Sequence, residues 1–321
     1  MGKIMKKFCI LAMVLVCFVF NFCQKDQNKM EKSMSDISSI QANLVFFYYP
    51  DLREAENFYG DILGLEKVLD YGFARIFRVS PSTFIGLVDE TKGMHDPSEP
   101  KSVTLSFITD EIDKWSLYLT DQGVPMHRPL DSSSRIPIRG FVALDPAGYF
   151  LEFERFLEHP QNTPLHEKLA PMQALFPPQT QETTRPADLG ILANIIWLYY
   201  KDVPEAQAFY ENSFGFELLV DQDFAKVYAS SPTGFIGLVD ESQGLHRFTP
   251  EKGVNVCFLT DEIDAWYGHF QAKKVKIKVM LEEMKSIPVK AFVAFDPGEY
   301  FIEFDHFLED PKNRRIRELL R

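Results

Sequence analysis

Two glutamates and two histidines recur at matching places along the chain and are the residues best suited to do chemistry. Glu152 lies in the segment 145–154, and Glu303 lies in the closely similar segment 296–305. Each segment opens with Asp-Pro, which is typical of a turn, and continues as a strand in which side chains alternate between two faces. A carboxylate on a buried strand face is unfavourable unless it is paired, binds a ligand or takes part in a reaction.

Three roles are open for Glu152 and Glu303. In a structural role, each forms an ion pair with a cation of the preceding strand, Arg139 or Lys290. In a functional role, each is a general base, or an anchor for a cationic or hydroxyl-bearing ligand, and desolvation raises its pKa towards neutrality. A metal ligand is the role that we favour least.

His95 and His246 are the histidines that both copies of the pattern keep. They follow Gly-Met and Gly-Leu in loops, where a histidine is usually solvated or makes an ordinary hydrogen bond. Because both copies retain it, a catalytic role in proton transfer near the mouth of a cavity stays open.

Aromatic side chains alternate along the strand that begins each copy. Tyr48 and Tyr199, with Phe46 and Trp197 two positions earlier, are predicted to share one strand face. Such a face is most often plain core, but it can also form the stacking wall for a flat, apolar ligand.

The elements that must position these residues occur twice. Residues 43–162 align with residues 194–313 at a constant offset of 151 positions, without a gap. Within each copy, a strand, an amphipathic helix and further strands occur and then start again. The sequence therefore predicts two tandem domains, each made of two βαβββ units. The expected parts are domains at 43–163 and 191–314, a Pro-, Gln- and Thr-rich extended linker at 164–190, and a tail at 315–321.

Four aspartates stand where the predicted helices begin. Short acidic side chains accept hydrogen bonds from the first free N–H groups of a helix, so we interpret all four as helix caps. They are Asp51, Asp110, Asp202 and Asp261.

One combination of motifs resembles a known family. A strand, Asp-Leu, a helix with Phe58-Tyr59, Leu63-Gly64 and a closing Asp-Pro-x-Gly-x-x-x-Glu are similar to the vicinal oxygen chelate superfamily of glyoxalase I, bleomycin- and fosfomycin-resistance proteins and extradiol dioxygenases. The resemblance covers nearly all of both predicted domains. It implies an α+β fold in which two βαβββ units form a curled, incompletely closed eight-stranded barrel around a cavity. It also implies a divalent metal held by His, Gln or Glu side chains from four strands.

Three of those four metal-binding positions carry other residue types in both copies, and only Glu152 and Glu303 match. Leucine, isoleucine and glycine side chains cannot coordinate a metal, and threonine or asparagine offers at most a weak neutral oxygen. We therefore expect no metal cofactor. The altered positions are Leu44, Gly86 and Thr104 in the first copy and Ile195, Gly237 and Asn255 in the second.

The start of the chain is typical of an export signal. Lysines precede the apolar run Phe8 to Phe22, which is short for a membrane span. Cys23 then begins a hydrophilic stretch and resembles the lipid-attachment cysteine of bacterial lipoproteins. We expect residues 1–23 to be a signal peptide or lipoprotein leader, residues 24–42 a polar tether, and the chain to be anchored in the bacterial envelope. An uncleaved membrane anchor is the alternative.

Composition limits the classes of partner. The chain of 321 residues has a formal net charge of −12, which disfavours binding to nucleic acid. Hydrophobic residues make up 45%, enough to fill sizeable cores. Cys257 is the only cysteine after the leader, so the globular part cannot form an internal disulfide.

Three functions follow as hypotheses. The leading one is the binding of a small, apolar or aromatic molecule without a metal. The second is a metal-independent lyase, isomerase, hydrolase or dioxygenase relative that uses Glu152 or Glu303 as its base. The third is a non-catalytic scaffold, and the oligomeric state stays open. The candidate ligand-binding residues are Phe46, Tyr48, Thr104, Arg139, Trp197, Tyr199, Asn255 and Lys290.

Overall fold

The computed structural model describes residues 40–130 and 136–321. The leader, Cys23 and nearly all of the predicted tether lie outside the described residues. Within the described ranges, the helices are too short or too polar to cross a membrane.

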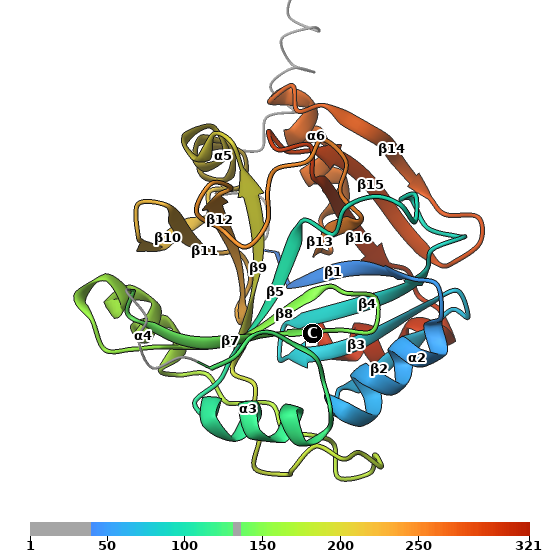
Figure 1. The fold of residues 1–321 in the computed structure, drawn as a ribbon. Coiled ribbons are helices and arrows are strands. Elements are labelled where there is room, and N and C mark those ends of the chain that lie inside the picture. Colours follow the sequence, from blue (N-terminus) through green and yellow to red (C-terminus); the bar gives the residue numbers. More distant parts are fainter. Residues whose placement is uncertain (1–39, 131–135) are drawn as a thin grey trace, which may run out of the picture.

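Four βαβββ units follow one another along the chain (Figure 1), as the repeats predict. Each unit starts with one strand, continues through a helix and ends with three more strands. The strands are β1 (Ala42–Tyr49), β2 (Glu66–Asp70), β3 (Ala74–Ser80) and β4 (Thr83–Asp89) in unit 1; β5 (Val103–Ile108), β6 (Met126–Arg128), β7 (Ile138–Leu144) and β8 (Phe150–Phe156) in unit 2; β9 (Ala193–Tyr200), β10 (Glu217–Asp221), β11 (Ala225–Ala229) and β12 (Gly234–Asp240) in unit 3; and β13 (Val254–Leu259), β14 (Ile277–Glu283), β15 (Val289–Phe295) and β16 (Phe301–Phe307) in unit 4.

The helices of units 1 and 3 each run into a π-helical turn before the second strand. Short helices also follow units 2 and 4. The helices are α2 (Leu52–Asn57, with the π turn Phe58–Ile62), α3 (Ile112–Asp121), α4 (Thr163–Leu169), α5 (Val203–Phe209, with the π turn Tyr210–Phe214), α6 (Ile263–Ala272) and α7 (Arg314–Leu319).

The strands form two curved sheets of eight strands each, and the order of strands shows that neither sheet is closed. The first sheet has the order β14-β15-β16-β13-β1-β4-β3-β2, and the second has the order β10-β11-β12-β9-β5-β8-β7-β6. The expected α+β architecture of two incompletely closed eight-stranded barrels is therefore confirmed.

The two barrels do not follow the two sequence repeats. Strand β1 pairs antiparallel with β13, and β5 pairs antiparallel with β9. Unit 1 thus shares its sheet with unit 4, and unit 2 shares its sheet with unit 3. The repeats alone predict that the two units of one repeat share a barrel, and this part of the prediction is wrong. The first strand of every unit presents the same kind of free edge, so the repeat alone does not decide which partner completes it.

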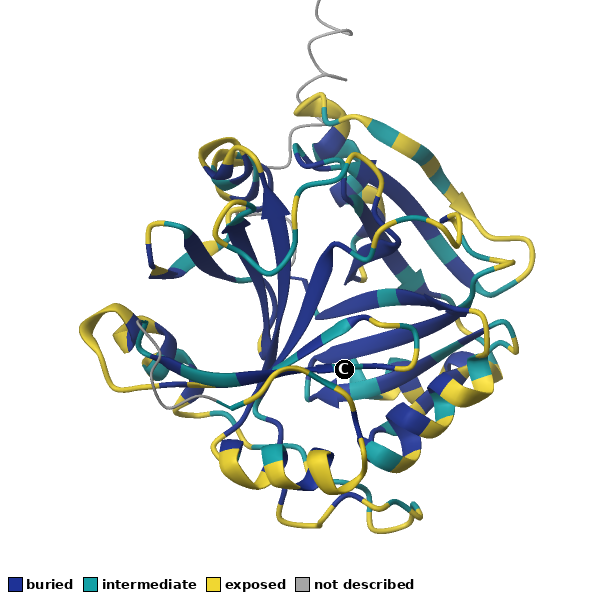
Figure 2. Cartoon of the chain, viewed as in Figure 1, coloured by how far each residue is buried: buried dark blue, intermediate teal, exposed yellow. Residues whose placement is uncertain are grey.

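The apolar residues form separate layers on the two sides of each sheet. One large core packs the helices on the convex faces, where Trp115, Tyr149 and Phe214 are buried. Smaller clusters line the concave faces, including Trp197 and Tyr199 inside the second barrel. Figure 2 shows this arrangement as dark strands flanked by helices with exposed outer surfaces. The concave faces are therefore where a cavity can lie.

Only some of the predicted helix caps form. The carboxylates of Asp51 and Asp202 accept hydrogen bonds from backbone N–H groups of α2 and α5, as expected. Helices α3 and α6 begin after Glu111 and Glu262, one residue beyond the predicted caps Asp110 and Asp261, and the side chain at each N-cap makes no capping bond. The prediction for Asp110 and Asp261 was wrong because the preceding threonine hydroxyl accepts the N–H of the residue at the start of each helix.

Candidate functional site

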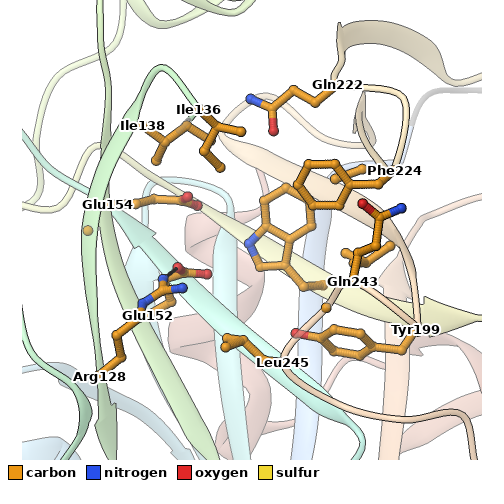
Figure 3. A pocket seen from close by; sticks show the side chains of 15 residues that line it. Arg128, Ile136, Ile138, Glu152, Glu154, Tyr199, Gln222, Phe224, Gln243 and Leu245 are labelled. Atoms are coloured by element: carbon orange, nitrogen blue, oxygen red, sulfur yellow. Dashed lines mark hydrogen bonds and ion pairs between the residues drawn. The ribbon is translucent and has the colours of Figure 1, made fainter. Parts of the chain in front are cut away.

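A cavity of about 280 Å³ lies on the concave face of the second barrel, between units 2 and 3 (Figure 3). Strands β7, β8 and β9 each supply two lining residues, strands β6, β11 and β12 supply one each, and the loop after β12 closes one side. Its volume is at the lower end of the usual range for small-molecule sites. The lining residues are Arg128, Ile136, Ile138, Gly140, Glu152, Glu154, Trp197, Tyr199, Gln222, Phe224, Ala225, Val239, Gln243, Gly244 and Leu245.

Two carboxyl groups enter this cavity from β8. Glu152 and Glu154 lie two positions apart and therefore face the same side of the strand. Figure 3 shows both on the wall that also carries Arg128. The guanidinium of Arg128 donates to Oε1 of Glu152, whereas the partner of Glu154 is the hydroxyl of Ser106. The pair is therefore unequal, because one acid faces a cation and the other faces a neutral donor.

Burial sets the protonation of this pair. It raises the pKa of Glu152, while the charge of Arg128 and its hydrogen bond lower it. The pKa of Glu154 is raised well above its ordinary value, first by burial and then by the charge of Glu152. The two acids therefore differ in their electrostatics, because Arg128 favours the charged form of Glu152, whereas the charge of Glu152 opposes ionisation of Glu154.

Aromatic side chains from unit 3 form the opposite wall, as the alternation along β9 predicts. Trp197 and Tyr199 both line the cavity, and Phe224 joins them from the residue just before β11. The hydroxyl groups of Tyr199 and Thr104 lie 2.7 Å apart and form a hydrogen bond. Thr104, a predicted ligand-binding residue, therefore positions the hydroxyl group of Tyr199.

His246 lies beside this wall, and its Nε2 is buried without a hydrogen bond to any residue that the structure describes. Its ring packs on Phe150 at 4.3 Å and meets Tyr199 edge-on at 5.0 Å between ring centroids. Burial and the neighbouring His127 lower the pKa of His246 to about 4. His246 is therefore neutral at physiological pH.

The side chains at the family's metal-binding positions in this barrel do not form a metal site. A Cβ atom added to Gly237 would lie 2.0 Å from Cε3 of Trp197, so the indole ring fills the space in front of that position. Ile195 and Thr104 provide no strong ligand, and Glu152 is engaged by Arg128. Among residues 40–130 and 136–321, no three His, Cys, Asp or Glu side chains converge as a metal-binding group.

The first barrel holds a chain of polar side chains at the equivalent place. Nδ2 of Asn255 donates to Glu303 at 2.8 Å, and Oδ1 of Asn255 lies 2.6 Å from Nε2 of His95. Nδ1 of His95 in turn lies 2.5 Å from Glu99. The structure thus brings His95 and Glu303 together through Asn255.

Among the residues that the structure describes, none forms an ion pair with Glu303. Burial raises its pKa to about 7, while the hydrogen bond from Asn255 acts in the opposite direction. The ring of His95 stacks on Phe301 at 4.4 Å and meets Tyr48 edge-on at 5.0 Å between ring centroids. Phe46 lies over Gly86, in the same manner as Trp197 over Gly237.

Arg139 and Lys290 lie on the outer side of their sheets. Arg139 pairs with Asp113 of α3, and Lys290 pairs with Asp264 of α6. Their predicted ion pairs with Glu152 and Glu303 were wrong, because residues Ile138 and Gly140 on either side of Arg139 face the cavity and alternation turns Arg139 away.

Several cavity residues were missed by sequence reasoning. Glu154 could have been found, since it shares its strand face with Glu152. Arg128 comes from the short edge strand β6, and Gln222 comes from the turn between β10 and β11. Neither has a local pattern that places it near Glu152.

Comparisons with known proteins agree with this architecture. Residues 41–153 and 192–304 match the Glyoxalase/Bleomycin resistance protein/Dioxygenase superfamily. Glyoxalase I from Zea mays is similar in structure, with a TM-score of 0.58 and 14% sequence identity over 86% of this chain and 94% of that one. A Bacillus subtilis subsp. subtilis str. 168 protein, provisionally named a dioxygenase, gives a TM-score of 0.59 and 16% identity over 84% of this chain and 86% of that one. No curated protein matches the sequence.

At these identities the two solved structures establish the fold alone, whereas the family match spans both repeats. The chain belongs to the glyoxalase/bleomycin resistance protein/dioxygenase superfamily.

Proposed function

We propose that this protein binds a small, flat, largely apolar molecule in the barrel of units 2 and 3, without the family's usual metal. The observation that carries the proposal is the cavity of about 280 Å³ that has an aromatic wall on one side and the acid pair on the other. The indole of Trp197 over Gly237 supports a metal-free site, because a coordinating side chain at position 237 would displace it.

Ligand-observed NMR with one-ring probes tests this proposal. Toluene, acetophenone, benzamidine and benzoate fit a cavity of this size, and differ in polarity and charge. We expect at least one of them to bind to the full chain, with binding unchanged by EDTA and weakened by Trp197→Leu. If no probe binds, or if binding needs a stoichiometric metal, the proposal is wrong.

An enzymatic function is the second candidate, and Glu303 favours it. A general base works best when its pKa is near the working pH, and burial brings the pKa of Glu303 to about 7. Asn255 donates to Glu303 and contacts His95, which in turn contacts Glu99, so this hydrogen-bonded chain fixes the orientation of the Glu303 carboxyl group.

Proton exchange can separate the two functions. An enzyme that uses Glu303 as a base would accelerate hydrogen–deuterium exchange at the methyl group of acetophenone in D₂O, and Glu303→Gln would abolish it. Under the binding proposal, the wild type and Glu303→Gln exchange no faster than buffer.

Export and anchoring through Cys23 are a further part of the proposal, since the leader pattern supports them. Labelling of the full-length protein with radioactive palmitate in a bacterial host tests this part. We expect label in the wild type and none in Cys23→Ala, whereas an unlabelled wild type would contradict lipidation.

A further inference from the structure

Among residues 40–130 and 136–321, two hydrogen-bond donors on the cavity wall are buried without a partner. Nε1 of Trp197 and Nε2 of Gln222 both lack an acceptor, and their residues are only 6% and 8% exposed. The indole N–H of Trp197 is close enough to Glu154 to favour its charged form, but it makes no hydrogen bond of normal geometry. A buried donor without an acceptor is unfavourable, so two of them in one cavity form a site for a ligand that accepts hydrogen bonds.

The acids of the cavity do not offer an equally free site for a cation. Glu152 is engaged by Arg128, and Glu154 takes the hydroxyl of Ser106. Figure 3 shows Gln222 on the side of the cavity across from the Glu152–Arg128 pair. A cationic ligand would be repelled by the two N–H donors and the guanidinium of Arg128. An anionic ligand would be repelled by the carboxylate of Glu152.

We propose that the ligand is a neutral aromatic molecule with a carbonyl-type oxygen, which accepts hydrogen bonds from Trp197 and Gln222 while its ring packs on Phe224 and Tyr199. This inference rests on the proposed function, because it names the class of molecule that the same cavity binds.

The ranking of the four one-ring probes tests the inference. Acetophenone has the oxygen, toluene lacks it, benzamidine adds a positive charge and benzoate a negative one. One hydrogen bond is worth about 0.5–1.5 kcal/mol net, so we expect acetophenone to bind about fivefold or more tightly than toluene, and both charged probes to bind more weakly than acetophenone.

Variants of the two donor residues test whether these residues cause the preference for acetophenone over toluene. Trp197→Phe keeps an aromatic ring but removes the N–H, and Gln222→Met removes the amide. Each should bring acetophenone close to toluene while toluene still binds. Trp266→Phe is the matched control, because Trp266 Nε1 is also buried without a partner but lies in the helix-packed core. It should leave the ranking unchanged.

The outcomes separate this inference from the function on which it rests. Tightest binding of benzamidine would show a cation site and overturn the inference, while leaving the binding function in place. Equal affinities for toluene and acetophenone in the wild type would also overturn it, since water would then satisfy the two donors. Absence of binding by all four probes would overturn the proposed function, and the inference with it.

Discussion

At the scale of single residues, buried carboxyl groups dominate the electrostatics of this protein. Besides the acids inside the barrels, Asp145 and Asp296 of the Asp-Pro turns are buried on the convex side. Oδ2 of Asp145 accepts the hydroxyl groups of Tyr49 and Tyr59, and its Oδ1 accepts the N–H of Tyr149. These bonds tie the turn of unit 2 to the first strand and helix of unit 1. The Asp-Pro turn that recurs in both repeats thus has a structural role.

Replacing Asp145 with asparagine should change how stability depends on pH. Burial raises the pKa of Asp145 to about 6, above its ordinary value of 3.8. A raised acid pKa stabilises the folded state at low pH, and this contribution is lost as the pH rises from about 4 through about 6. Between pH 7 and pH 5 the wild type should gain about 1 kcal/mol of unfolding free energy relative to Asp145→Asn.

Urea unfolding at the two pH values measures this difference. Asp296→Asn should behave alike, because burial also raises the pKa of Asp296 to about 6. Asp113→Asn is the control, since the hydrogen bond from Arg139 lowers the pKa of Asp113 below its ordinary value of 3.8. Its contribution changes only below pH 5, so this variant should parallel the wild type between pH 7 and pH 5. Parallel pH profiles for the wild type and Asp145→Asn would contradict the assignment.

At the scale of elements, the segment between the repeats is a packed strap rather than an extended linker. Its first part is helix α4, and its later part crosses the helices of units 1 and 2. The side chain of Arg185 donates to the carbonyl groups of Leu63, Leu175 and Leu189, and its guanidinium lies 4.9 Å from the ring centre of Trp115. Prolines predict irregular backbone correctly here, but backbone irregularity does not imply freedom from tertiary contacts.

Arg185→Ala should destabilise the fold. Arg185 is 4% exposed, and its removal takes a donor from three carbonyl groups and leaves a void beside Trp115. Of the three, the carbonyl group of Leu175 keeps the N–H of Ile191. We expect a loss of about 2–4 kcal/mol in unfolding free energy, together with faster proteolysis between residues 171 and 190. Arg53→Ala, on the exposed face of α2, should change stability by less than about 0.5 kcal/mol. Equal stability of both variants would show that the strap is not held by Arg185.

At the scale of the whole molecule, the repeats cross-pair around a pseudo-twofold centre. There, the N–H of Ser82 donates to the hydroxyl of Thr233, and the N–H of Thr233 donates to the hydroxyl of Ser82. The side chain of Asn43 donates a hydrogen bond to Ser230. Its counterpart Asn194 makes no side-chain hydrogen bond to a described residue. The reason is that Val79 occupies the position that corresponds to Ser230. The symmetry is therefore approximate, and the two barrels have different interiors.

An isolated first repeat should not form a closed monomer. Residues 40–163 contain β1 and β5, whose antiparallel partners β13 and β9 belong to the second repeat. Two copies of the fragment can restore both pairings, so we expect the fragment to form a homodimer by analytical ultracentrifugation, with the full chain measured alongside for comparison. A folded monomer of the fragment would contradict the cross-paired topology.

The sequence predicts the units well and the site only in part, for physical reasons. Alternation and helical spacing fix which face Tyr199, Trp197 and Glu152 take, because these are local properties of one strand. The partner of each unit, and hence the meeting of His95 with Asn255, depends on docking between segments about 160 positions apart. Arg128 reaches Glu152 across a sheet, and no local pattern reports such a contact.

The occupancy of the second barrel tests the account most directly. We would titrate the EDTA-treated full chain with 4-fluoroacetophenone, observed by ¹⁹F NMR, and compare Ala225→Leu with Ala74→Leu. Ala225 lines the cavity, and Ala74 is its counterpart in the first barrel. We expect one site per chain, an affinity lowered about tenfold or more by Ala225→Leu through overpacking of the cavity, and an affinity within about twofold of the wild type in Ala74→Leu. Loss of binding after EDTA treatment, or equal loss in both variants, would contradict a metal-free site between units 2 and 3.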